Sequence, residues 1–462
     1  MTEKHTKKNK YLRKPRLRPA HTIALGFLAV IVLGAFLLCL PISTNDFKWM
    51  NFIDALFTST SAVSTTGLIT IGDTAAYFSV FGQIVLLILI QFGGVGVMSI
   101  TTLFMMLLRR KITLKDRMVM QMEFNQDEGR GMVRLGRNIM LVTLAIEGAG
   151  FLLLLAPFCL ANGAYGIWQA LFISVSSFCN AGFDIMGMTQ GLGSSLSGFA
   201  GDVMVNLSVS FLIITGGLGF TVLMDIGKHK WRFKKLTLHS KLVLIASGVL
   251  ILVGWAFFFG AEFNNAGTIG NMSVGNKLLV SLFQSISPRS AGFATVNQGN
   301  LTSASKFMTV VLMFIGASPG STGGGVRTTT LMVIILISVA GLRETDDITV
   351  GKHKLNRQST RKAVSVFVLS LLIVLISAVI LLFSEKSSGA TFEDILFECA
   401  SAFATSGLTC GITGSLSVIG KIVIMINMFL GRVGMITIGL MFVSKKGGDN
   451  NIRYPEGNVA IG

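Results

Sequence analysis

The chain has 462 residues, of which 51% are apolar and only 13% are charged. Soluble domains carry about 25% charged residues, so this composition excludes an ordinary soluble protein and indicates a membrane protein. The formal net charge is +17, but the positions of the basic residues, given below, explain it without a nucleic-acid partner. The five histidines form no catalytic cluster, and we expect a non-enzyme.

Eight apolar stretches are long enough to cross a hydrocarbon core of about 30 Å, which needs roughly 20 residues. In chain order they cover residues 20–40, 78–108, 136–160, 202–226, 239–260, 305–342, 361–384 and 417–443. We therefore predict an all-α integral membrane protein with eight transmembrane helices. Residues 1–19 form a basic tail without a signal-peptide pattern. This tail is either a solvated charge run or a docking segment.

The basic residues alternate with the predicted spans. Of 39 lysines and arginines, 31 lie in residues 1–20, 109–138, 228–241, 343–362 and 445–462. Eight spans place all five segments on one side of the membrane, and the positive-inside rule makes that side cytoplasmic. The expected location is the cell membrane, multi-pass, with both termini cytoplasmic. The five cysteines show no metal-binding spacing and are interpreted as small hydrophobic residues.

A short motif recurs in the four outer connections. It reads LFTSTSAVSTTGL from Leu56, LFISVSSFCNAGF from Leu171, LFQSISPRSAGF from Leu282 and LFECASAFATSGL from Leu396. The four glycines are Gly67, Gly182, Gly292 and Gly407. Each stretch is too short to span and suits a re-entrant half-helix. The third copy is one residue shorter than the others.

The unit is therefore a span, a half-helix, a loop and a second span, and four such units predict pseudo-fourfold symmetry around one pore. The predicted divisions are a basic tail (1–19), repeat 1 (20–108), repeat 2 (136–227), repeat 3 with a broken second helix (239–342), repeat 4 (361–444) and a C-terminal tail (445–462). Half-helices that converge on an axis would direct the negative ends of their dipoles toward it. The carbonyls of the following loops can then replace the hydration shell of a monovalent cation.

The predicted selectivity filter has four residues from each loop. They are Thr65, Thr66, Gly67 and Leu68; Asn180, Ala181, Gly182 and Phe183; Ser290, Ala291, Gly292 and Phe293; and Thr405, Ser406, Gly407 and Leu408. The alternative is that the four loops are re-entrant packing elements without conduction. Four equivalent copies at nearly equal spacing favour the filter.

These loops resemble the four selectivity loops of the Trk/Ktr/HKT potassium transporter superfamily. The segment GASPGSTGGGVRTTT (316–330) resembles its broken third-repeat helix, and GRVGMITIGL (431–440) resembles its last helix. The ending IRYPEGNVAIG and the short N-terminal region are similar to KtrB-type membrane subunits. The one departure in the loops is Ser290, where threonine is expected.

The resemblance implies potassium uptake by a homodimer with one pore per subunit. It also implies KtrA-type nucleotide-binding regulatory subunits on the cytoplasmic side and Na⁺ as an activator, with K⁺ as the transported ion and no covalent cofactor. In plant relatives, serine at the position of Gly67 accompanies sodium transport, so glycine there favours potassium. A sodium or non-selective cation transporter of the same fold is the alternative.

The resemblance also implies a gate, for which the candidate residues are Gly316, Ala317, Ser318, Pro319, Gly320, Ser321, Thr322, Gly323, Gly324 and Gly325. Their composition breaks a helix. The segment is not a phosphate loop, because the motif's lysine is absent. A tolerated kink is the other interpretation. Arg432, within the last predicted span, must face the pore or a partner. It acts as a barrier below the filter, as a structural partner of backbone carbonyls, or as both.

Two questions stay open in the sequence. Glu147, inside the third span, is either an ion-coupling group or, as we favour, a paired structural acid. A secondary transporter for a small organic solute is also conceivable, but such folds often have inverted repeats, whereas these repeats run in parallel. A membrane receptor is disfavoured because no large soluble domain is present.

Overall fold

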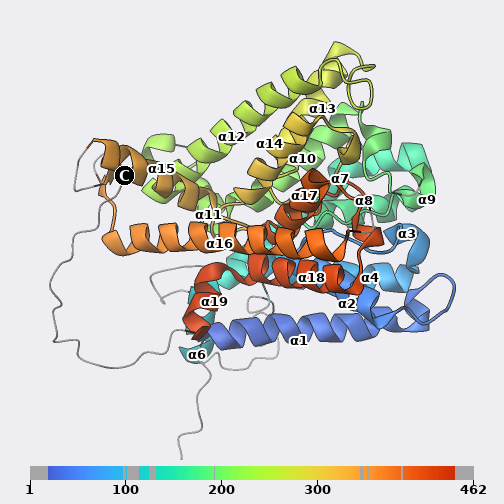
Figure 1. Ribbon diagram of the computed structural model, residues 1–462, viewed down its shortest axis with the longest axis horizontal. Coiled ribbons are helices and arrows are strands. Elements are labelled where there is room, and N and C mark those ends of the chain that lie inside the picture. The colour runs from blue at the N-terminus through green and yellow to red at the C-terminus, as the bar shows by residue number, and fades with distance from the viewer. Residues whose placement is uncertain are drawn as a thin grey trace, which may run out of the picture.

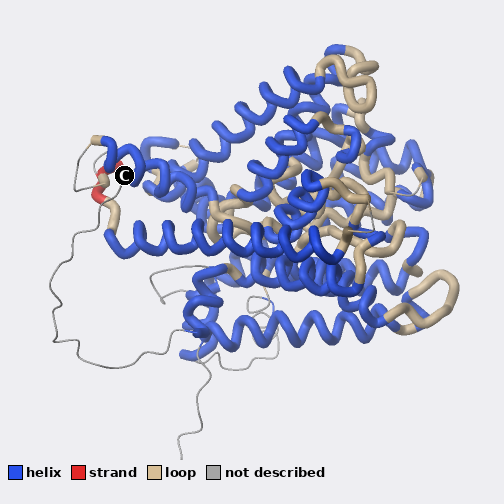
Figure 2. Tube along the Cα trace, in the orientation of Figure 1, coloured by secondary structure: helices blue, strands red, loops and turns tan. Residues whose placement is uncertain are grey.

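A computed structural model describes residues 19–96, 100, 114–123, 132–191, 193–230, 232–343, 348–350, 353–386 and 389–442. Residues 1–18 of the predicted basic tail, the predicted C-terminal tail 445–462 and parts of the loop 109–138 (109–113 and 124–131) therefore lie outside the described residues. The regular secondary structure of the described part is almost entirely helical (Figure 2), and the all-α prediction is confirmed. The exception is a two-stranded antiparallel hairpin of β1 (Thr349–Val350) and β2 (His353–Lys354), which precedes the seventh predicted span.

Each repeat begins with one long helix. These helices are α1 (Pro19–Cys39), α7 (Met132–Asn162), α12 (Leu238–Glu262) and α16 (Arg357–Ser384). All four are long and apolar enough to cross a membrane. Many of their large apolar side chains are exposed, such as Leu33 on α1 and Leu252 on α12. Exposed apolar faces of this extent suit contact with lipid.

Each long helix is followed by a pore helix. These are α2 (Phe52–Ser64), α8 (Tyr165–Phe178), α13 (Val274–Ile286) and α17 (Phe392–Phe403), with 13, 14, 13 and 12 residues. Three pore helices carry a serine at the same position, and its hydroxyl donates to a carbonyl of the long helix. The pairs are Ser59 to Ile31 at 2.7 Å, Ser174 to Glu147 at 2.6 Å and Ser285 to Ile251 at 2.7 Å. A glycine three residues after each carbonyl makes room for the serine. The repeat is therefore one of packing as well as of sequence.

The second helix of each repeat begins at a capped residue and then breaks. The four are α4 (Val80–Val95), α10 (Val203–Leu218), α14 (Ser303–Phe314) and α18 (Val418–Val433), and their caps are Ser79, Asp202, Thr302 and Ser417. These side chains accept hydrogen bonds from backbone N–H groups of the first turn, as capping residues do.

We predicted a broken second helix in the third repeat, and the second helices of the other three repeats also end at a glycine. The helices α4, α10 and α18 end at Gly96, Gly219 and Gly434, whose φ angles are 96°, 96° and 86°. Only glycine adopts such angles readily. The chain continues as α11 (Phe220–His229) at 99° to α10 and as α19 (Met435–Phe442) at 95° to α18. Two such bent pairs raise the candidate spans from four to six. The other two second segments are α4, which runs into undescribed residues, and α14 with α15 (Thr328–Leu342), separated by the glycine-rich segment.

The remaining elements are short. They are α3 (Thr74–Tyr77), α6 (Leu114–Glu123), α9 (Gly187–Gln190), η1 (Pro41–Ser43), η2 (Ser197–Phe199), η3 (Phe233–Lys235), η4 (Gln298–Asn300) and η5 (Thr413–Ser415). Figure 1 shows α16 and α18 side by side, with α19 turned away from the end of α18. It also places α3 and α9 at one end of the molecule and α6, α15 and α19 at the other.

Candidate ion pathway

The four pore helices end in the same backbone geometry. A residue with positive φ stands two positions before each loop glycine. These residues are Thr65 (54°), Asn180 (53°), Ser290 (65°) and Thr405 (49°), and the glycines are Gly67 (97°), Gly182 (69°), Gly292 (80°) and Gly407 (84°). A non-glycine residue in the left-handed region is uncommon. Four of them in register show that the loops share one conformation.

The loops form a closed ring in chain order. A Cβ atom built on Gly67 would lie 2.6 Å from the Ala181 carbonyl oxygen, one on Gly182 would lie 2.9 Å from that of Ala291, and one on Gly292 would lie 2.6 Å from that of Ser406. A Cβ on Gly407 would overlap the Thr66 carbonyl oxygen, which returns the ring to the first loop. The four glycines thus lie around a common centre, each against a carbonyl from the next repeat.

The other candidate filter residues surround this ring. The side chains of Leu68, Phe183, Phe293 and Leu408 are at most 1% exposed and pack into the apolar core. They therefore contribute backbone to the ring, while their side chains hold the loops in place. Hydroxyls join neighbouring loops: Ser290 Oγ donates to the Ala404 carbonyl at 2.8 Å, and Ser406 Oγ to that of Pro288 at 3.0 Å.

The pore helix of the third repeat ends earlier than the other three, and the cause is local. Helix α13 ends at Ile286, six residues before Gly292, whereas the other pore helices end three or four residues before their glycines. Pro288 has no backbone N–H and cannot extend the helix. The chain turns instead through Ser290, whose N–H donates to the Pro288 carbonyl at 2.8 Å.

The glycine-rich segment 316–325 docks against the ring and against α10. The Ser318 and Thr322 N–H groups donate to the Gly217 and Gly216 carbonyls at 3.0 and 3.2 Å, and Phe220 N–H donates to Gly320 at 2.9 Å. Thr65 Oγ1 donates to the Thr322 carbonyl at 3.1 Å. A Cβ on Gly324 would strike the Thr405 side chain. The segment is therefore an ordered loop whose backbone groups have hydrogen-bond partners, as irregular backbone within a membrane protein requires. It belongs to the third repeat and contacts the other three.

Arg432 ties this segment to the first repeat. Its guanidinium donates to the carbonyls of Thr322 and Gly93, and to that of Gly94 at 3.2 Å. The residue lies near the end of α18, two positions before the break at Gly434. Carbonyl partners of this kind offset much of the cost of an intramembrane arginine.

The chain is similar to known transport proteins over almost its whole length. The family model described as "TrkH: Cation transport protein" matches residues 19–454. The chain belongs to the TrkH cation transport family. Its relatives include the Ktr system potassium uptake protein B of Bacillus subtilis, 39% identical over 98% of this chain and 99% of that protein. The potassium/sodium uptake protein NtpJ of Enterococcus hirae is 37% identical over 98% of this chain and 99% of that protein.

A solved structure shares the fold. The potassium transporter TrkH from Vibrio parahaemolyticus superposes with a TM-score of 0.71 at 18% identity, covering 95% of this chain and 87% of that one. This TrkH-family chain is accordingly a multi-pass membrane transporter and not an enzyme.

Sequence reasoning missed two features around the ring of this TrkH-family chain. Arg327, two residues after the glycine-rich segment, donates to the Gly323 and Ser318 carbonyls at 2.5 and 3.3 Å and so closes the segment on itself. The helix breaks carry a further repeat, GGVG at 93–96, GGLG at 216–219 and GRVG at 431–434. A Cβ on Gly93, Gly216 or Gly431, the first residue of each, would overlap a carbonyl near the end of a pore helix. The repeated glycine spacing in these three motifs could have predicted the helix breaks from the sequence.

Glu147 lies behind the second loop and is 5% exposed. Both of its carboxylate oxygens accept from Gln91 Nε2, at 3.0 and 2.9 Å, and Cys179 Sγ donates to Gln91 Oε1 at 2.9 Å. These contacts link α4, α7 and the end of α8. Glu147 thus has partners on neighbouring elements, as the structural interpretation of this residue expects.

Proposed function

We propose that the chain is the pore-forming subunit of a Ktr-type system that takes up potassium across the cytoplasmic membrane. The observation that carries this proposal is the ring in which Thr66, Ala181, Ala291 and Ser406 carbonyls each lie against the glycine of a neighbouring repeat. An uncharged site of backbone oxygens can replace the hydration shell of a monovalent cation. A divalent ion would call for carboxylates.

The filter in this proposal comprises the sixteen loop residues named above, and the four repeats keep the divisions predicted from the sequence. Residues 316–325 act as the gate, because they lie against the ring and hold five glycines that ease backbone rearrangement. Arg432 acts as a barrier in the pathway and as a latch for that gate through the Thr322 carbonyl.

The proposed assembly is a homodimer with cytoplasmic KtrA-type nucleotide-binding subunits, and both termini are cytoplasmic. Several relatives are named as Ktr system uptake proteins, and a system implies further subunits. The hairpin β1–β2 lies between α15 and α16, in the basic segment 343–362, and α15 continues directly from the gate segment. A subunit that binds this region could therefore act on the gate, with Na⁺ as an activator.

A sodium or non-selective monovalent cation transporter is the second candidate. It is favoured by the similarity to NtpJ, which is named as a potassium/sodium uptake protein. Both candidates use the same ring and differ only in which ion it prefers.

The test is growth of a bacterial strain without its own potassium uptake systems on limiting potassium, with and without this chain. Uptake of ⁸⁶Rb⁺ is then measured against rising Na⁺ or K⁺. Rescue, with Rb⁺ uptake displaced by K⁺ and not by Na⁺, supports the first candidate. Equal displacement by both ions supports the second, and no cation uptake by a folded protein with its regulatory subunit would refute both.

A further inference from the structure

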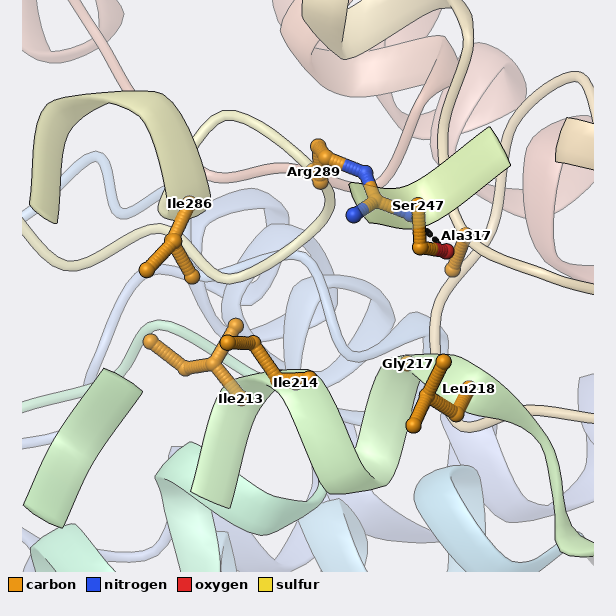
Figure 3. Close-up of a pocket in the computed structure, with 8 residues that line it drawn as sticks. All are labelled: Ile213, Ile214, Gly217, Leu218, Ser247, Ile286, Arg289 and Ala317. Carbon is orange, nitrogen blue, oxygen red and sulfur yellow. Dashed lines mark hydrogen bonds between the residues drawn. The ribbon is translucent and has the colours of Figure 1, made fainter. Parts of the chain in front are cut away.

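Arg289 stands in the third loop between Pro288 and Ser290, and its side chain points away from the ring. It is 8% exposed and enters a small cavity between α10, α12 and α13, as Figure 3 shows. Its Nη2 donates to Ser247 Oγ on α12 at 3.0 Å, and its Nε has no hydrogen-bond partner. The guanidinium is thus held by one neutral hydroxyl.

The charge of Arg289 has no anion beside it. Among the residues that the structure describes, no carboxylate forms an ion pair with this side chain. The cavity is lined mainly by apolar groups, including Ile213, Ile214, Leu218 and Ile286. A buried charge without a partner costs several kcal/mol. Stability alone therefore does not explain an arginine at this place.

The same position in the other three loops is uncharged. Counting three residues back from each glycine gives Ser64, Cys179, Arg289 and Ala404. A charged side chain at this position thus occurs in one of the four repeats, and the ring is flanked by a positive charge on one of its four sides (quadrants).

Arg289 also stands at the C-terminal end of α13, which is the negative end of that helix dipole. Arg289 follows the last helical residue, Ile286, by three positions, and its N–H donates to the Ile286 carbonyl at 3.2 Å. A cation at a helix C-terminus offsets the negative end of the dipole. In the other three repeats, the negative end of the pore-helix dipole favours a cation in the ring. In the third repeat, the positive charge of Arg289 opposes this effect.

We propose that Arg289 is an affinity-determining residue that weakens cation binding in the ring through its positive charge. The inference rests on the proposed function, because it assumes that the ring binds the transported ion. An ion that is bound too tightly leaves slowly, and conduction requires binding weak enough for release. One uncompensated charge beside one loop lowers the affinity without altering the carbonyl ring itself.

The expected effect is modest. Three residues of chain span at most about 11 Å, so the Arg289 backbone lies within about that distance of Gly292. The guanidinium lies at the far end of a side chain that points away from the ring, so its charge is roughly 10 to 15 Å from an ion there. At an effective dielectric constant of about 20, a unit charge at that distance changes ion affinity by about six- to fifteenfold, and salt screening lowers this effect. Neutralising Arg289 should therefore lower the half-saturating K⁺ concentration by about three- to tenfold.

The sharpest test leaves the arginine in place. Ser247→Asp would put a carboxylate where the hydroxyl now meets Arg289, and Ser247→Asn is its matched neutral control. In the full-length purified protein, K⁺-dependent thermal stabilisation gives the half-saturating concentration without requiring transport. Rb⁺ uptake in cells gives a second value. We expect tighter K⁺ binding in S247D and wild-type binding in S247N.

A role of Arg289 in merely holding the loop predicts another pattern. Both Ser247 variants would then weaken or broaden ion binding alike, and this result would overturn the inference, as would unchanged affinity in a folded S247D. If S247D does not fold, Arg289→Met against Arg289→Lys provides the same contrast, with tighter K⁺ binding expected only in R289M. Absence of K⁺ stabilisation and uptake in the wild type would instead refute the proposed function.

Discussion

Gly67→Ser perturbs the ring at one defined contact. The Cβ of the serine would lie 2.6 Å from the Ala181 carbonyl oxygen and 2.9 Å from Gly182 Cα, both within the second loop. The φ angle at this position is 97°, which side-chain-bearing residues rarely adopt. The substitution must therefore move the first loop, the second loop or both, and the oxygens of the ring with them.

The size of the selectivity change follows from the backbone strain and from the steric overlap. Holding a non-glycine residue at such an angle costs of order 1–3 kcal/mol, and relief of the steric overlap requires a shift of several tenths of an ångström. Each 1.4 kcal/mol corresponds to a factor of ten in an equilibrium constant. If the strain is relieved by moving the ring, we expect the preference for K⁺ over Na⁺ to fall by about tenfold or more.

A matched control lies five residues further along the chain. Gly72 is exposed and has no positive φ, and a Cβ added to it would have no other atom within 4 Å, so Gly72→Ser changes the same residue type at no structural cost. Both variants are expressed in a strain without potassium uptake, and ⁸⁶Rb⁺ influx is measured against increasing K⁺ and Na⁺. Wild-type selectivity in a folded G67S protein would refute the assignment of the first loop to the filter.

Four further expectations concern the surroundings of the ring. Deleting part of 318–325 should raise K⁺ flux and make this flux independent of the regulatory subunit. If the deletion variant folds and its flux stays low and regulated, the segment is a helix kink and not a gate. Arg432→Ala should raise resting flux several-fold, because both the charge and its carbonyl contacts are lost; Arg432→Lys is the charge-retaining control, and equal flux in all three proteins would argue against a barrier. Lys306→Met should destabilise the protein by about 1–3 kcal/mol, because Asp394 loses its ion pair of 2.9 Å with Lys306. Thermal unfolding of variants that replace Lys306, Asp394 or both should show non-additive losses of stability. Burial raises the pKa of Asp184, two residues beyond Gly182, to about 7, so its charge appears as the pH rises through that value. Uptake at low external K⁺ should then increase between about pH 6 and 8. Folding stability should fall as the pH rises from about 4, where this carboxyl ionises in the unfolded chain, to about 7, and should level off above that. Asp184→Asn should remove both trends.

The sequence was sufficient for the repeat architecture. The Leu-Phe start and the glycine end of each outer motif predicted four half-helices, and the structure has four pore helices of 12 to 14 residues at those places. The reason is that both signals are local, namely an apolar stretch too short to span and a glycine that must follow it. The ion-binding role of the loops is still a prediction, although their glycines do lie together.

The helix breaks at Gly96, Gly219 and Gly434 were not predicted, because a hydropathy window averages over a glycine with apolar neighbours. The partners of Arg432 were equally out of reach. Its contacts with Thr322 and Gly93 join residues 110 and 339 positions away, and no local pattern encodes such a separation. The sequence did show that a charged Arg432 inside a predicted span is energetically costly, and therefore that it needs a partner.

Arg432 also illustrates what a single-chain ring permits. It occupies the second position of GRVG, where the first two repeats have Gly94 and Gly217. A tetramer of identical subunits would have to place four arginines at this level, and their mutual repulsion would work against assembly around a narrow axis. Covalent linkage of the four repeats lets each quadrant diverge alone. Four repeats in one chain thus permit a class of asymmetric pores that a homotetramer cannot build by any point mutation.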